Sequence, residues 1–124
     1  MKNRHSRPDR KAIHEAVRAA TETDRPFKEN LYSSLRFQLD SVMTSAPEAS
    51  GVYGLFNGLW VYIGETDNIR ERILKHLDGD LPCISRYRPS GFAFELVSPA
   101  ARRLRLEYLI EKYQPFCQCS RRKP

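Results

Sequence analysis

The stretch SGVYGLFNGLWVYIGETDNIRERILKH, residues 50–76, decides the fold of this chain. Two short apolar segments flank Asn57-Gly58, and each segment carries one tyrosine and one glycine near its far end. An Asn-Gly pair between apolar segments predicts a β-hairpin, because a type I′ turn needs a positive φ at both central residues. The stretch therefore predicts two antiparallel strands joined by a tight turn.

The predicted hairpin specifies which residues lie opposite each other on the two strands and which side chains share a face of the sheet. A two-residue loop would place Tyr53 opposite Tyr62 and Gly51 opposite Gly64. Bare glycines at the open end of the hairpin would let another group approach the backbone closely. Because side chains alternate between faces, we expect an apolar face of Val52, Phe56, Leu59, Val61 and Ile63, and an aromatic face of Tyr53, Leu55, Trp60 and Tyr62. A tyrosine pair that only stabilises the sheet is the alternative interpretation.

A helix over about residues 68–77 is predicted next. Ile69, Ile73 and Leu77 recur at helical spacing and should form its buried stripe. Arg72 and His76 are four residues apart and lie together at the edge of that stripe. They either line a cleft beside the tyrosines, or Arg72 pairs with a surface carboxylate and His76 only flanks the core.

A strand over residues 92–97 and a helix over residues 99–113 follow, the helix with Pro99 in its first turn. Leu106, Leu109, Ile110 and Tyr113 should form the buried arc of this helix. Glu107 lies just off that arc, and a surface ion pair with Arg103 is the simplest role for it. The intervening segment, residues 78–91, is expected to be a loop. Its arginines, Arg86 and Arg88, flank a tyrosine, which suits either nucleic-acid contact or an ordinary charged surface.

The N-terminal region, residues 1–47, is predicted to hold two helices, over residues 8–21 and about 30–44. The second has Leu31, Leu35, Leu39, Val42 and Met43 on one face, which favours packing on the core. The predicted organisation is thus a basic helical extension over 1–47, one domain over 48–119, and a basic tail over 120–124.

Composition narrows the class of protein. The 124 residues suit one domain, with net charge +6 and a pI near 9.5. The positive charge lies at the two ends of the chain, which favours a polyanionic partner. We expect no membrane span and no signal peptide, hence a cytoplasmic protein. Cys83, Cys117 and Cys119 are expected to be free thiols, with a zinc site as the weaker alternative.

Together these residues resemble the signature of the GIY-YIG nuclease family. Gly51-Val52-Tyr53 and Tyr62-Ile63-Gly64 match its two halves, and the residues ETDNI, Arg72 and His76 follow at the expected spacing. The segment LEYLIEKYQPFCQ is similar to the carboxylate helix of the family and the proline segment after it. The resemblance covers residues 50–118. It implies an α/β (α+β) fold: a small three-stranded antiparallel sheet flanked by helices, here with two extra N-terminal helices.

The resemblance also implies an activity, namely divalent-metal-dependent hydrolysis of DNA phosphodiester bonds by an endonuclease. Glu107 would be the metal ligand, for Mg²⁺ or Mn²⁺, and Arg72 would lie on the scissile phosphate. Tyr53 would be the general base or would orient the water, and Tyr62 and His76 would complete the pocket. A phenolate base would make the rate climb above neutral pH.

Substrate contacts and partners are the remaining expectations. The family commonly has Asn where this chain has Gln118, so contacts there could be weakened or displaced. The alternative function is a nucleic-acid-binding module of the same fold with little or no cleavage. Site selection would rest on the loops, the N-terminal helices or an accessory protein. Double-strand cleavage would need a homodimer or sequential nicking. We expect substrate contacts from Gly64, Thr66, Arg86, Arg88, Arg103 and Gln118.

Overall fold

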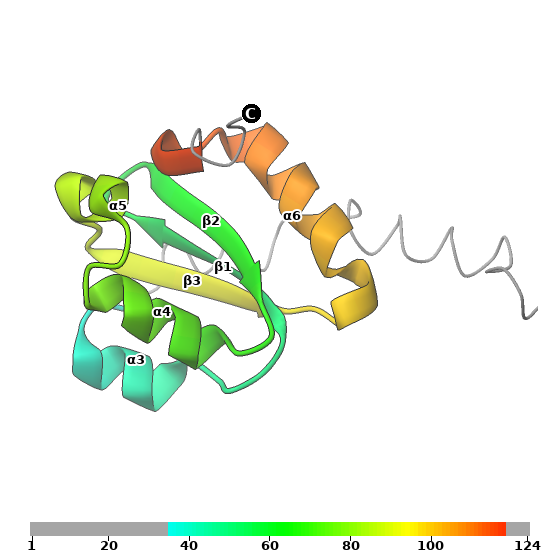
Figure 1. Cartoon of the computed structure of the whole chain (residues 1–124), viewed down its shortest axis with the longest axis horizontal. Helices are drawn as coiled ribbons and strands as arrows, with labels where there is room; N and C mark the ends of the chain where they lie inside the picture. Colours follow the sequence, from blue (N-terminus) through cyan, green and yellow to red (C-terminus); the bar gives the residue numbers. More distant parts are fainter. Residues whose placement is uncertain (1–34, 119–124) are drawn as a thin grey trace, which may run out of the picture.

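The computed structural model describes residues 35–118, and a three-stranded antiparallel sheet in the order β2-β1-β3 lies at their centre (Figure 1). The predicted helix over 8–21 and the tail over 120–124 lie outside these residues. In the described part of the chain, no helix has both the length and the apolar character needed to cross a membrane. The elements in chain order are α3 (Leu39–Ser45), β1 (Gly51–Phe56), β2 (Trp60–Thr66), α4 (Ile69–Leu77), α5 (Pro82–Tyr87), β3 (Gly91–Leu96) and α6 (Pro99–Tyr113).

The hairpin β1–β2 is confirmed, but its predicted register is wrong. The loop has three residues, with the Asn57 amide donating to the Leu59 carbonyl at 3.0 Å. Gly58 has a φ of +98°, whereas Asn57 does not have the positive φ that a type I′ turn also requires. An irregularity between Leu55 and Phe56 then shifts the pairing again, so that Tyr53 lies opposite Gly64.

The shifted register also corrects the predicted faces. Leu59 was expected in the core but lies in the loop and is 61% exposed. Trp60 packs edge-on against Phe56, with ring centroids 5.4 Å apart, instead of joining the tyrosines. Val61 was expected on the face opposite Tyr53, but it lies in the core that contains Tyr53. The prediction holds for Tyr53, Leu55 and Tyr62 on one side, and for Val52, Phe56 and Ile63 on the other.

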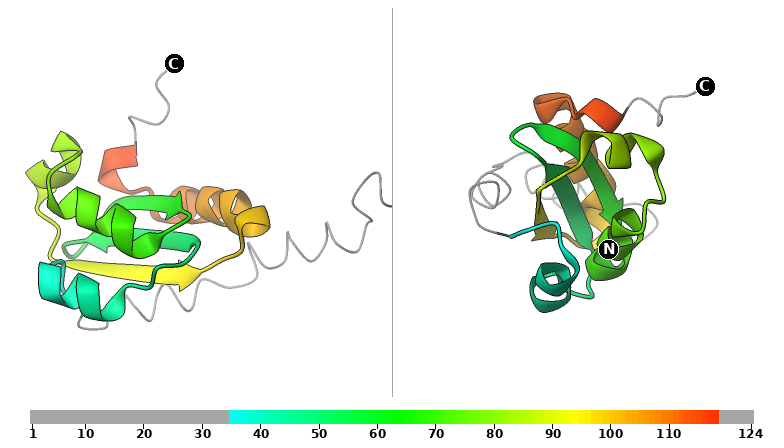
Figure 2. Two further views of the ribbon diagram at one scale, coloured as in Figure 1. Left: turned by 60° about the horizontal axis from the view of Figure 1, so that its bottom comes forward. Right: turned by 90° about the vertical axis from the view of Figure 1, so that its left-hand side faces the viewer.

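Each face of the sheet is covered by its own helices. α3, α4 and α5 contribute Val42, Ile73 and Ile84 to the core that contains Tyr53. α6 contributes Leu106 and Leu109 to the core on the other side. The right-hand view of Figure 2 shows α3 at the bottom and α6 at the top, with the strands between them.

The bounds predicted for α4 and α6 are confirmed, to within one residue for α4 and at both ends for α6. The Asn68 side chain caps α4 by accepting from the Glu71 amide at 3.0 Å. In α6, Leu106 and Leu109 are fully buried, whereas Ile110 and Tyr113 are only partly buried beside them. The third strand is confirmed as β3, shifted by one residue from the predicted range.

Two predicted segments are corrected. The helix expected over 30–44 begins only at Leu39 within the described residues, because the Leu35 carbonyl and the Phe37 amide bond to backbone beside β3 instead. As a result Leu39 and Met43 are 64% and 47% exposed. Of the four stripe residues that the structure describes, only Val42 is fully buried, and Leu31 lies outside the described residues. The expected loop over 78–91 contains a short helix, α5, with Pro82 at its start.

The cysteine prediction is also wrong for two of the three residues. Cys83 on α5 and Cys117, after α6, form a disulfide with their Cα atoms 5.7 Å apart. The two residues are separated by 34 positions in the sequence, so only the tertiary fold brings them together. Cys119 lies outside the described residues. The disulfide connects α5 to the short helical turn over residues 116–118.

Candidate active site

The site begins where the Tyr53 ring crosses the glycine opposite it on β2. A Cβ atom placed on Gly64 would lie 2.6 Å from the Tyr53 hydroxyl oxygen and 2.9 Å from Cε2 of Tyr62. Both distances are far below normal van der Waals contact. Gly64 is therefore required because the two tyrosine rings occupy the volume that any other side chain would need.

Tyr53, Tyr62 and His76 form one cluster between the sheet and α4. The Tyr53 hydroxyl lies 2.8 Å from Nε2 of His76. The ring of Tyr62 meets the His76 ring edge-on, with centroids 5.2 Å apart, and lies 6.1 Å from the Tyr53 ring. Tyr53 is fully buried and His76 is 3% exposed, whereas Tyr62 is half-buried. Tyr62 is therefore the phenol of the pair that reaches the surface.

The surroundings of Tyr53 keep its phenol protonated. Burial raises the pKa of Tyr53 well above its usual value of about 10, and the neighbouring Tyr62 raises it further. The Arg72 guanidinium lowers the pKa of Tyr53, but by less than burial raises it. At neutral pH the Tyr53 hydroxyl therefore carries its proton and can donate it to a hydrogen bond.

The pKa of His76 is shifted in the opposite direction from that of Tyr53. Burial lowers the pKa of His76 below its usual value of about 6.5, and the positive charge of Arg72 lowers it too. The Asp80 carboxylate, 2.8 Å from Nδ1 of His76, raises the pKa of His76 but does not outweigh burial. The imidazole is therefore neutral at neutral pH.

Arg72 borders a polar hollow of about 360 Å³ between the start of α4 and the start of α6. Its side chain is half-buried and lies close enough to Tyr53 and His76 to influence the pKa of both. The remaining lining residues are all polar or charged: Glu65, Thr66, Asp67, Asn68, Glu71, Arg102 and Arg103.

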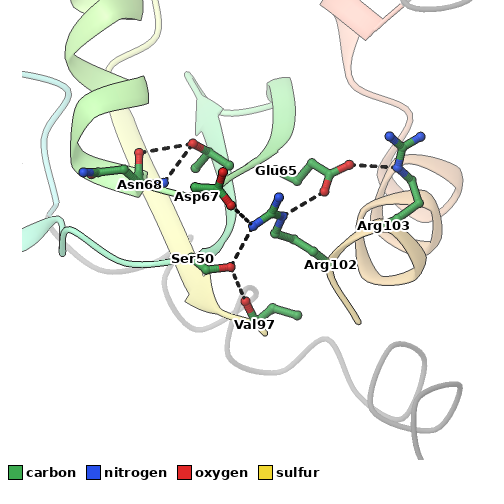
Figure 3. Close-up of polar contacts among 8 residues, drawn as sticks. Ser50, Glu65, Asp67, Asn68, Val97, Arg102 and Arg103 are labelled. Atoms are coloured by element: carbon green, nitrogen blue, oxygen red, sulfur yellow. Dashed lines mark hydrogen bonds and ion pairs between the residues drawn. The ribbon is translucent and has the colours of Figure 1, made fainter. Parts of the chain in front are cut away.

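An ion-pair network forms one wall of this hollow (Figure 3). The Arg102 guanidinium donates to Glu65 at 2.9 Å and to Asp67 at 2.7 Å. It also donates to the Ser50 hydroxyl at 2.9 Å, which in turn donates to the Val97 carbonyl. The network ties the end of β2 to the first turns of α6.

Three of the predicted site residues have structural contacts that the sequence did not specify. Arg103 pairs with Glu65 at 2.8 Å and not with Glu107, so the alternative role of Glu107 as a surface partner of Arg103 is excluded. The Thr66 hydroxyl accepts from the Asn68 amide at 3.0 Å and shapes the turn into α4. Gln118 is 5% exposed, and its side-chain amide bonds both the N–H and the C=O of Ile63, at 3.0 Å and 2.9 Å.

Three further predicted site residues, Arg86, Arg88 and Glu107, belong to parts of the structure other than the tyrosine–histidine cluster. Arg86 and Arg88 are exposed at the end of α5, beside Tyr87, whose ring stacks on Phe116.

Glu107 is exposed on α6, and its carboxylate forms no ion pair among residues 35–118. In the same residues, no three His, Cys, Asp or Glu side chains gather as a metal site. A lone carboxylate nevertheless fits Mg²⁺, which binds through one or two carboxylates and keeps several waters.

Two residues of the site were missed by the sequence reasoning. Asp80 contacts His76 directly, and its spacing of four residues from His76 was a usable signal. Arg102 organises the wall of the hollow, but nothing in its sequence neighbourhood distinguishes it from Arg103. Only the packing of α6 against β2 shows which of the two arginines points inward.

The chain has similarity to solved structures of known proteins. It is similar to the crystal structure of the GIY-YIG N-terminal endonuclease domain of UvrC from Thermotoga maritima bound to magnesium, with a TM-score of 0.54 and 23% sequence identity. A tyrosine-to-phenylalanine variant of that domain with its catalytic divalent cation gives a TM-score of 0.54 and 24% identity. Each match covers 62% of this chain, and 94% and 93% of the respective UvrC chains.

The fold is that of a GIY-YIG endonuclease domain. No protein-family model matches the sequence, and no curated protein does. The three-stranded antiparallel sheet and flanking helices implied by the sequence resemblance are thereby confirmed for residues 35–118.

Proposed function

We propose that this protein is a divalent-metal-dependent endonuclease that hydrolyses DNA phosphodiester bonds. The observation that carries the proposal is the buried Tyr53–His76 hydrogen bond beside Arg72, within a GIY-YIG fold. A proton acceptor, a phenol and a cation thus meet at one place. Phosphodiester hydrolysis uses a proton acceptor and a cation, because a water must lose a proton while negative charge develops on the phosphoryl oxygens.

Arg72 is the cation best suited to the scissile phosphate. The other four arginines of α4 and α6, namely Arg70, Arg102, Arg103 and Arg105, each pair with a carboxylate. Among the described residues, the Arg72 guanidinium has no such ion pair, although it is half-buried. A partly desolvated guanidinium without a carboxylate partner favours an anion from outside the protein.

The pKa directions favour His76 as the final proton acceptor, with the tyrosines as its link to solvent. The Tyr53 hydroxyl lies 2.8 Å from Nε2 of His76. With Nε2 as the acceptor, a proton received by Tyr53 can be passed on at once. Tyr53 itself is buried, and the half-buried Tyr62 is the phenol that an attacking water can contact. In this proposal Tyr62 takes a proton from the water and passes its own hydroxyl proton to Tyr53, which passes its proton to His76. No free phenolate is needed at neutral pH.

The exposed Glu107 carboxylate would hold the metal. Bound Mg²⁺ or Mn²⁺ would act as a Lewis acid and stabilise the negative charge that develops on the phosphate. Further contacts to DNA would come from Arg86 and Arg88, which lie exposed beside the stacked rings of Tyr87 and Phe116. Exposed arginines and aromatic rings are the combination that binds phosphates and bases. Double-strand cleavage would require a homodimer, an accessory protein or two successive nicks.

Nicking of supercoiled plasmid DNA with Mg²⁺, Mn²⁺ or EDTA tests the proposal. We expect metal-dependent nicking that falls about 10²-fold or more in Arg72→Ala and in Glu107→Ala, because each removes charge stabilisation of the transition state. Arg70→Ala and Glu111→Ala are matched controls on the same two helices and should nick at the wild-type rate. Salt-sensitive DNA binding without any nicking would instead support the alternative, a binding module of this fold.

The pH dependence of nicking separates a histidine base from a phenolate base. His76 accepts a proton only when it is neutral, and its pKa lies below 6.5 in the folded protein. We therefore expect the rate to rise with pH in a range below 6.5 and to be level across neutrality. A rate that keeps climbing between pH 7 and 9 would instead indicate a tyrosine phenolate as the base, since an unperturbed phenol has a pKa of about 10.

A further inference from the structure

The chain reverses direction directly after α4 and returns an acidic side chain to the last turn of the helix. α4 ends at Leu77, and Gly79 has a φ of +86°, a left-handed conformation that glycine adopts without strain. The Gly79 amide bonds to the His76 carbonyl at 3.0 Å. This turn brings Oδ1 of Asp80 to 2.8 Å from Nδ1 of His76.

The two contacts of His76 determine which ring nitrogen carries the proton. An ionised carboxylate only accepts hydrogen bonds, so Nδ1 of His76 must donate to Asp80. Nε2 of the neutral ring is then an acceptor, and it lies 2.8 Å from the Tyr53 hydroxyl. The ring is 3% exposed, so water does not compete for either nitrogen.

We propose that Asp80 is a positioning residue that holds His76 in the Nδ1–H tautomer, with Nε2 free to accept the proton of Tyr53. Asp80 does not touch the reacting atoms and acts through His76. The proposal rests on the proposed nuclease function for its catalytic consequence. The tautomer itself is a property of the folded chain and can be measured without any substrate.

The charged and titratable groups around the ring support this role. Tyr53 from β1 and Tyr62 from β2 face His76, and both are phenols. Arg72, one turn earlier on α4, disfavours a positive charge on the ring. Asp80 is the one group in this set that favours the positive charge that His76 gains when it accepts a proton. Asp80 would thus both orient the imidazole and stabilise the imidazolium.

A nitrogen-15 NMR measurement of the His76 ring in the metal-free full chain tests the proposal. His76→Gln assigns the signals, because the chain has three histidines. We expect the Nδ1–H tautomer in the wild type and a shift toward Nε2–H in Asp80→Asn, because the asparagine amide can donate to Nδ1. Asp78→Asn, the same change in an exposed neighbour, should leave the tautomer as it is.

Nicking kinetics provide the second readout. In Asp80→Asn we expect kcat to fall about 10²-fold or more, by analogy with carboxylates that hold a catalytic histidine in other enzymes. DNA affinity should stay within about twofold, and Asp80→Glu should recover most of the rate because it keeps the carboxylate. An Nε2–H tautomer in the wild type, or an unchanged tautomer and rate in Asp80→Asn, would overturn the proposal.

The two proposals can fail separately. If the wild type shows Nδ1–H and Asp80→Asn changes it, but no condition gives nicking, the positioning of His76 stands and the nuclease function fails. If nicking is metal-dependent but insensitive to Asp80→Asn, the nuclease function stands and the role of Asp80 fails.

Discussion

The sheet face toward α4 and the face toward α6 are formed by the same three strands, but they bury different groups. Toward α4, the Tyr53 hydroxyl and the His76 ring are buried in a line of hydrogen bonds that ends at Asp80. Toward α6, aliphatic side chains such as Ile63, Leu106 and Leu109 fill the core, and an ion pair of Arg105 with Glu95 closes one side. The first face carries titratable groups within hydrogen-bond distance of one another, and the second holds the sheet and α6 together.

This difference has a physical origin. A neutral phenol and a neutral imidazole can be buried at modest cost because each of their polar atoms has a hydrogen-bond partner. The protons in such a line of hydrogen bonds remain free to move along it. The Arg105–Glu95 pair is also buried, but both charges are fixed and neither group is placed to exchange a proton. Substitutions on the α4 face should therefore alter activity more than stability, and substitutions on the α6 face the reverse.

Tyr53→Phe should give the largest change and should affect activity. We expect nicking to fall about 10²- to 10⁴-fold, the range for loss of a proton-transfer group. The ring remains in place, so the stability loss should be about 1–3 kcal/mol, from Nε2 of His76 losing its partner. Plasmid nicking and thermal unfolding check the two expectations, with the half-buried Tyr108→Phe on α6 as the control. A Tyr53→Phe protein that nicks at the wild-type rate would exclude Tyr53 from the relay.

Glu95→Ala should give the largest loss of stability. The change removes the carboxylate at 2.9 Å from the Arg105 guanidinium, which is 1% exposed. Removing one partner of a buried ion pair costs about 3–5 kcal/mol. Urea unfolding measures the loss, with the exposed Glu111→Ala on α6 as the control. Nicking by the folded fraction should be unchanged, and a selective loss of activity would contradict the division between the two faces.

Gln118→Ala should have an intermediate effect, because it removes both hydrogen bonds to the buried backbone of Ile63. A buried polar group left without its partner costs about 1–3 kcal/mol. The exposed Gln38→Ala is the control in the same unfolding experiment. A loss of DNA affinity at unchanged stability would show instead that Gln118 contacts substrate, as the sequence resemblance implied.

Arg103→Ala should have the smallest effect on stability. The Arg103 side chain is 67% exposed, and Glu65 keeps its second partner, Arg102. Exposed ion pairs contribute about 0–1 kcal/mol, so the unfolding free energy should change by less than that. Arg102→Ala is the comparison, and it should cost more because the Arg102 side chain is only 17% exposed and has several partners. Equal losses in the two variants would contradict the inward and outward roles assigned to them.

The sequence allowed the prediction of those features that depend on neighbours in the chain. The Asn68 cap, the stripe of Ile69 and Ile73, and the Pro99 start of α6 are local patterns, and all three are present in the structure. The hairpin was predicted for the same reason, from Asn57-Gly58. Its register was not, because the loop takes one more residue and an irregularity between Leu55 and Phe56 shifts the pairing again.

The same distinction between local sequence patterns and long-range packing applies to the candidate site. Tyr53, Tyr62 and His76 were expected to share one pocket, and the structure brings their rings together. The partners of the charged residues were not predictable, since Glu65 is 37 residues from Arg102 and Gln118 is 55 residues from Ile63. Such contacts depend on which helix face packs against which strand. The disulfide was missed for the same reason.

The Gln118 contact has a consequence for the behaviour of the protein at high concentration. β2 is an edge strand, and the outer N–H and C=O of Ile63 are the groups through which a foreign strand would pair with it. The Gln118 amide occupies both, as a neighbouring peptide group would. Exposed strand edges are the usual starting points for aggregation. The side chain thus completes the sheet with one amide and protects the protein against self-association through β2.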